Sequence, residues 1–181
     1  MNIKRFITTS LIAMSVSVTP ALAQSNHESH ERLWSTLQLI GINTVLNHKH
    51  RCAGKDIDGS YNSRAGVLII CQDGSYAGGP QSDWTENDYD TLRHEAHHVL
   101  QDCNKGELGD GLLGDLFEDA DEWEQFVTNG LTTDQIKIIV ESYTESGVGP
   151  KVIAHELEAF SAANSVDANT IANKLVEFCS L

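Results

Sequence analysis

The residues with the most specific chemistry in this chain are His94, Glu95 and His98, which form the pattern H-E-x-x-H. On an α-helix, positions i and i+4 lie one above the other on one face, so both imidazoles can bind one metal ion. Glu95 follows the first histidine and can reach a water molecule on that metal. Zinc lowers the pKa of such a water to about 7, and the carboxylate can accept its proton. The pattern therefore predicts a zinc site at which Glu95 is the general base.

A third protein ligand is needed, because a catalytic zinc usually has three protein ligands and one open position. Glu156 and Glu158 are the candidates, and both lie on a predicted helix downstream of the histidines. They lie about 200° apart around a helix, so only one of them can bind the metal. Asp102 follows His98 by four residues and is a candidate to support that histidine by a hydrogen bond.

The H-E-x-x-H pattern can bind a metal in this way only on a helix, and residues 86–104 are predicted to form one. Thr85 and Asp88 resemble a capping box at its start, and acidic residues crowd its first turns, where the helix dipole favours them. An apolar stripe with helical spacing is formed by Leu92, Ala96, Val99 and Cys103. We therefore expect both histidines beside a buried face.

The remaining elements are a few strands and several helices. Other helices are predicted over residues 31–40, 112–128, 134–145, 151–164 and 168–179. Apolar or β-branched runs predict strands over 42–47 and 66–71, whereas 56–63 and 73–82 have the composition of turns and loops. A small N-terminal sheet followed by a mostly helical half that carries the H-E-x-x-H helix is an α+β layout.

The first 23 residues have the pattern of a cleavable signal peptide. Lys4 and Arg5 precede an apolar run that ends in the cleavage motif Ala21-Leu22-Ala23, and an uncleaved anchor is the alternative. Residues 24–181 suffice for a single domain. Without Lys4 and Arg5 the chain keeps 10 of its 12 basic residues against 26 acidic ones, a net charge of −16. This charge argues against nucleic acid and anionic membranes as partners.

The four cysteines predict two disulfides, because an even number in an exported chain meets an oxidising compartment. Three pairings are possible, and we favour Cys52–Cys71 and Cys103–Cys179. The first would join two neighbouring strands, and the second would join the last helix to the end of the H-E-x-x-H helix. A cysteine-rich metal site is not favoured, because the chain has no C-x-x-C pair.

Residues 156–159, Glu-Leu-Glu-Ala, form an E-x-x-A pattern downstream of the H-E-x-x-H pattern. In this combination the chain resembles the gluzincin metallopeptidases, in which a glutamate on a later helix completes the zinc site. The resemblance favours Glu156 over Glu158 as that ligand. The chain departs from the thermolysin-like version, which has an aspartate four residues after the ligand glutamate, because Phe160 stands there.

A longer part of the chain is similar to small exported HExxH proteins of cyanobacteria and cyanophages. The similarity lies in Gly59-x-Tyr61, in residues 68–72 and in residues 91–103. It implies a zincin-like metallopeptidase fold. In such folds an edge strand beside the metal-binding helix often binds an extended substrate by strand addition, and strand 66–71 or its neighbour would serve.

Together these features predict an exported zinc metallopeptidase, periplasmic or extracellular, with Zn²⁺ as its cofactor. We expect an endopeptidase that acts on peptide or protein substrates and has no stable membrane insertion after signal cleavage. Tyr143 is a candidate to stabilise the oxyanion, and Tyr76 could reach into the cleft. Two alternatives remain, namely a zinc-binding protein without catalysis and an acidic, disulfide-stapled interaction module.

Overall fold

The computed structural model of this chain describes residues 20–54, 57–104 and 108–179. It contains a small three-stranded sheet and six helices, with a helical C-terminal half, so the predicted α+β class is confirmed. Most of the predicted signal peptide, residues 1–19, lies outside the described residues, and its cleavage stays a prediction. Within the described residues, no helix is long and apolar enough to cross a membrane.

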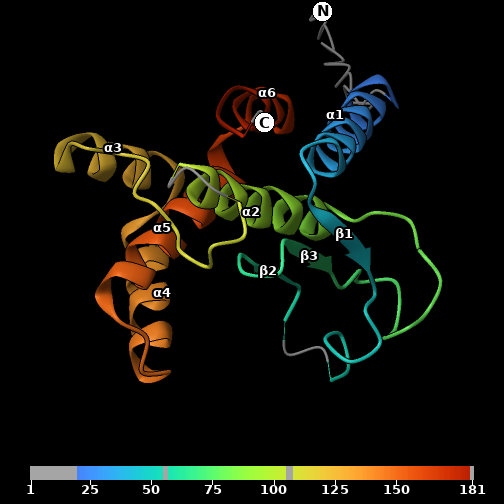
Figure 1. Cartoon of the computed structure of the whole chain (residues 1–181), viewed down its shortest axis with the longest axis horizontal. Helices are drawn as coiled ribbons and strands as arrows, with labels where there is room; N and C mark the ends of the chain where they lie inside the picture. Colours follow the sequence, from blue (N-terminus) through green and yellow to red (C-terminus); the bar gives the residue numbers. More distant parts are fainter. Residues whose placement is uncertain (1–19, 55–56, 105–107, 180–181) are drawn as a thin grey trace, which may run out of the picture.

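Helix α2 (Glu86–Cys103) is the central element, and it carries the H-E-x-x-H pattern as predicted. Its capping box is present: Thr85 Oγ1 accepts the Asp88 N–H, and the Asp88 carboxylate accepts the Thr85 N–H. Figure 1 shows α2 between the sheet on one side and the pair formed by α1 (Pro20–Leu39) and α6 (Ala168–Phe178) on the other. Because α2 is covered on both sides, 13 of its 18 residues are buried.

The sheet contains β1 (Asn43–Leu46), β2 (Gly59–Asn62) and β3 (Val67–Ile70) in the order β1-β3-β2. β1 runs parallel to β3, whereas β2 runs antiparallel to it and forms the edge nearest to α2. The prediction of a turn over 56–63 was therefore wrong. Gly-Ser-Tyr-Asn has no apolar alternation, and its backbone pairing with β3 makes it a strand.

The main hydrophobic core lies where α1, α2, α6 and β3 meet. On the helices its fully buried side chains follow the spacing expected for helices that pack on one face, and β3 contributes alternate residues. They include Leu33, Leu37, Leu68, Ile70, Leu92, Val99, Ile171 and Leu175. This core holds one face of α2 in place and leaves the His94 face for a different neighbour.

That neighbour is α5 (Pro150–Ser165), which crosses α2 and also packs against α3 (Ala120–Gly130) and α4 (Thr133–Glu145). A second apolar cluster holds these three helices together around Val127, Leu131 and Leu157. The expected helix over 112–128 begins only at Ala120. Its true start is set by Asp119, whose side chain accepts the N–H groups of the first turn.

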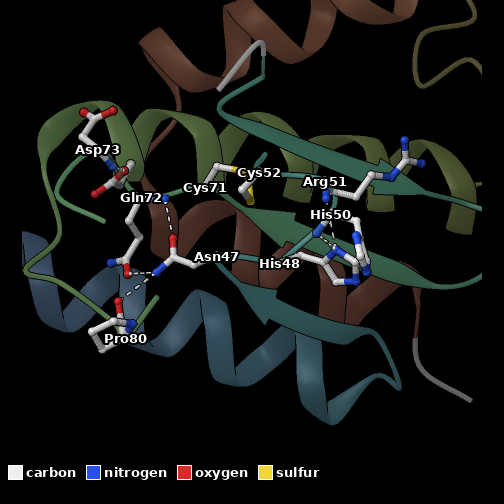
Figure 2. The surroundings of a disulfide bond; sticks show 10 residues. Asn47, His48, His50, Arg51, Cys52, Cys71, Gln72, Asp73 and Pro80 are labelled. Carbon is white, nitrogen blue, oxygen red and sulfur yellow. Dashed lines mark hydrogen bonds between the residues drawn. A yellow bond between two sulfur atoms is a disulfide. The ribbon is translucent and has the colours of Figure 1, made fainter. Parts of the chain in front are cut away.

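Both favoured disulfides form in the structure. Cys103–Cys179 joins the last residue of α2 to the end of α6, as expected. We had predicted that Cys52 lies in a strand, but it lies in the turn after β1. Its disulfide joins that turn to Cys71 at the end of β3 (Figure 2). Asn47 and Gln72 strengthen this junction: Asn47 Oδ1 accepts the Gln72 N–H at 2.9 Å, and Asn47 Nδ2 donates to Gln72 Oε1 at 3.1 Å.

Candidate metal centre

His94 and His98 meet Glu156 where α5 crosses α2, and the three side chains form a cluster that could hold a metal ion. The two Nε2 atoms lie 3.1 Å apart, and Glu156 oxygens lie 3.3 Å from His94 Nε2 and 3.5 Å from His98 Nε2. Ligands at about 2.0–2.1 Å from a tetrahedral zinc would lie roughly 3.3 Å from one another. The observed separations therefore match the size of such a site.

Glu158, the competing candidate, lies on the other side of α5 and does not join the cluster. Its Oε2 accepts a hydrogen bond from Gln101 Nε2 at 2.9 Å and lies 3.6 Å from His97 Nε2. Glu158 as a whole is 2 % exposed, so these two partners replace the hydration of its carboxylate in the protein interior. The crossing of α5 over α2 thus brings Glu156 rather than Glu158 to the histidine pair.

Gln101 is a site residue that the sequence analysis missed. Its Oε1 lies 2.8 Å from His98 Nδ1, and its Nε2 donates to the His155 carbonyl at 3.1 Å as well as to Glu158. The side chain is completely buried. The available signal was its position three residues after His98, because residues i and i+3 are neighbours on a helix and an amide oxygen can accept an imidazole proton.

Asp102 does not support His98, and that prediction was wrong. Its Oδ2 accepts a hydrogen bond from Tyr61 Oη at 2.5 Å and another from the Gly109 N–H at 3.3 Å. Burial and the Asp102 carboxylate together raise the pKa of Tyr61. Asp102 therefore joins α2 to β2 and to the segment after α2, and Gln101 takes the role that we had expected of it.

His94 is held by packing rather than by a second hydrogen bond. Phe160 lies edge-on against its ring, with centroids 4.4 Å apart. His94 Nδ1 is buried and has no hydrogen-bond partner in the described part of the chain. Phe160 stands where the thermolysin-like pattern has an aspartate, so an aromatic contact orients this imidazole.

Glu95 directly follows His94 on α2, and its side chain lies against β2. A Cβ added at Gly59 would lie 3.1 Å from Glu95 Cγ and only 2.6 Å from Thr91 Cγ2. Glycine at position 59 thus allows the edge strand to approach the carboxylate closely. The Glu95 side chain is buried, yet it lines an open cavity together with His94.

Burial and mutual contact shift the pKa values of these groups apart. Burial raises the pKa of Glu95 to about 7 and lowers the pKa of His94 to about 4. Burial would also lower the pKa of His98, but its hydrogen bond to Glu156 and the nearby carboxylates raise it to about 9. Burial opposes ionisation of Glu156, yet its hydrogen bonds to both histidines keep the pKa of this carboxyl far below its usual range.

The cavity beside the cluster has a volume of about 420 Å³ and lies between β2, α2 and α5. Tyr143 lines it, and its hydroxyl donates to Glu156 Oε2 at 2.7 Å. Tyr76 is 69 % exposed and is not among the lining residues, so the structure does not bear out the expected reach of this side chain into the cleft. Of the two predicted tyrosines, only Tyr143 lies at the site.

Comparisons with known proteins do not assign this chain to a family. A comparison with protein-family models finds no match, and searches of curated proteins and of solved structures also find none. The chemistry of the site therefore has to be argued from its residues. They are two imidazoles and one carboxylate that could hold a metal ion, beside a buried glutamate and an open cavity.

Proposed function

We propose that this protein is an exported zinc-dependent endopeptidase. The observation that carries the proposal is the convergence of His94, His98 and Glu156, whose ligand atoms all lie within 4.8 Å of one another. A set of two histidines and one glutamate is typical of catalytic zinc with one position left for water or substrate. When bound, zinc would lower the pKa of a water molecule to about 7 and polarise the scissile carbonyl.

Glu95 is the proposed general base. It follows a metal-ligand candidate, lines the same cavity and has a pKa raised to about 7 by burial. A carboxyl with such a pKa can both accept and donate a proton at neutral pH. Glu95 would therefore accept a proton from the attacking water and then deliver it to the leaving amine.

Tyr143 is the proposed donor to the developing oxyanion. Its hydroxyl faces the cluster through the hydrogen bond to Glu156, and burial together with that carboxylate raises its pKa. The phenol thus keeps its proton at neutral pH and can donate it in a hydrogen bond.

The edge strand β2 supports a peptide substrate rather than a small molecule. It pairs with β3 on one side only, and Gly59 brings it against Glu95. An extended peptide could pair with the other edge of β2, which would place a backbone carbonyl beside the metal ligands. Export is supported by the N-terminal pattern of residues 1–23 and by the two disulfides.

The decisive experiment compares Glu95→Gln with the parent protein on a casein-type substrate. We expect the variant to keep one zinc per chain and to lose hydrolysis, because the amide cannot accept the water proton. Glu177→Gln, an exposed change on α6, should behave like the parent. Cleavage by Glu95→Gln at the parent rate would refute the mechanism, and a zinc-loaded parent that cleaves no peptide in a broad library would favour the non-catalytic alternative.

A further inference from the structure

Part of the wall of the cavity beside the candidate metal centre is apolar. Ile57 stands at the β2 side, and Phe160 and Ala163 face it from α5. Its volume is about 420 Å³, within the range of cavities that bind small ligands or side chains. A long side chain of the substrate therefore has room here, with its methylene groups against these three residues.

Carboxylates stand at the same cavity. Asp58 precedes Gly59 at the start of β2, and Asp90 lies one helical turn before His94 on the same face of α2. Among the described residues that line the cavity, none is a lysine or an arginine. A substrate side chain that enters it meets both apolar side chains and carboxylates.

The two aspartates differ in their surroundings. Asp90 already accepts a hydrogen bond from Arg93, whose positive charge offsets its own. Asp58 is exposed and takes part in the backbone through its carbonyl, which accepts the Cys71 N–H at 2.7 Å. Asp58 is therefore the residue whose charge is most available to a ligand.

We infer that this cavity binds a lysine or arginine side chain, so that the protein cleaves peptides beside a basic residue, with Asp58 as a specificity-determining residue. The inference rests on the proposed peptidase function. A long basic side chain covers apolar surface with its stem and presents its charge to a carboxylate, which matches both features of the cavity. The negative net charge, −14 for the whole chain, would also attract cationic peptides from a distance.

The test uses three peptides that differ only at one position, which holds lysine, its uncharged analogue norleucine, or glutamate. Cleavage by the zinc-loaded full chain gives a ratio of kcat/KM for the lysine and norleucine peptides. We expect that ratio to favour lysine and to fall about fivefold in Asp58→Asn, the size of one partly solvated ion pair. Asp58→Lys should favour the glutamate peptide, and Glu124→Gln, an exposed change on α3, should leave the ratio as in the parent.

Binding of the same peptides to the zinc-loaded Glu95→Gln variant separates the two ideas. Cleavage without a preference for lysine, or a preference that Asp58→Lys does not change, would overturn the inference and leave the peptidase proposal standing. Binding that favours lysine and depends on Asp58, without cleavage by the parent, would support the cavity assignment and overturn the peptidase proposal. Neither binding nor cleavage of any of the three peptides would overturn both.

Discussion

The side-chain oxygen of Gln101 faces Nδ1 of His98 at 2.8 Å, and this contact decides which nitrogen of His98 can bind a metal. Both hydrogens of the Gln101 amide are directed to acceptors, the Glu158 carboxylate and the His155 carbonyl. The amide oxygen must then face His98, and Nδ1 must be the donor. The lone pair of the neutral imidazole is thereby placed on Nε2, which points to His94 and Glu156.

We predict that Gln101→Leu weakens zinc binding about 10- to 100-fold, because His98 loses the acceptor that fixes its tautomer and ring orientation. The measurement is competition with a chromophoric zinc chelator. Asp102→Asn is the matched control. Asp102 directly follows Gln101, but its side chain accepts a hydrogen bond from Tyr61 and does not contact His98. Equal zinc affinities of the two variants would show that Gln101 has no such role.

Glu156→Gln and Glu158→Gln form a second matched pair, because they make the same change two residues apart on α5. We expect Glu156→Gln to lose stoichiometric zinc after dialysis and Glu158→Gln to retain one zinc per chain. Metal analysis of both proteins, with circular dichroism to confirm folding, decides the matter. Retention by Glu156→Gln with loss by Glu158→Gln would reverse the ligand assignment.

Zinc binding should release a proton near pH 7. The folded, metal-free protein raises the pKa of His98 to about 9, so this imidazole is protonated at pH 7 and must become neutral to bind the metal. Affinity should therefore rise with pH by roughly tenfold per unit until about pH 9 and then level off. Calorimetry at pH 7 in buffers of different ionisation enthalpy measures the released proton, and a value near zero would contradict the shift.

A side chain added at Gly59 should disturb the site, because it would push β2 away from α2. Gly59→Ala places a methyl group 2.6 Å from Thr91 Cγ2, and such overpacking costs about 1–3 kcal/mol. We expect lower stability in urea and slower peptide cleavage, because β2 moves away from Glu95. Thr91→Ser removes the clashing methyl and should restore part of both in the double variant, whereas no recovery would place the damage elsewhere.

The two disulfides should differ in their effect on stability. Their cysteines are separated by 19 residues in Cys52–Cys71 and by 76 residues in Cys103–Cys179. In the chain-entropy model these loops correspond to about 3 and about 4 kcal/mol. Urea unfolding of the two paired Cys→Ser variants measures the difference, and a larger loss for the shorter loop would argue against the entropic account.

The sequence carried enough local information to predict α2, its capping box and its two histidines. Thr85, Asp88 and the apolar spacing are all signals within one helix. By contrast, α3 was placed too far upstream because apolar spacing continues back to Leu112, whereas residues 112–119 are not helical and the Gly114 N–H donates to the Gln101 carbonyl at 2.6 Å.

The choice between Glu156 and Glu158 as the third ligand candidate could not be derived from local sequence patterns. Glu156 and Glu158 lie on opposite sides of one helix, and only the packing of α5 on α2 decides which one faces His94. The spacing of Gln101 from His98 was a local signal, but the two acceptors of its amide group come from α5 and lie more than 50 positions along the chain. Contacts of this kind depend on how helices cross, and no periodicity within either helix encodes that crossing.

The bond between Cys103 and Cys179 also turns the helical half of the protein into a covalent ring. Glu156 lies within this ring, between Cys103 and Cys179. Both histidines lie on α2, just before the ring begins at Cys103. A single cut in the exposed turn at Ser146 and Gly147 would open the ring without releasing a fragment. Glu156 would remain attached to the histidines through α6 and the disulfide, so the three residues of the candidate metal centre would stay in one covalently joined molecule after such a cut.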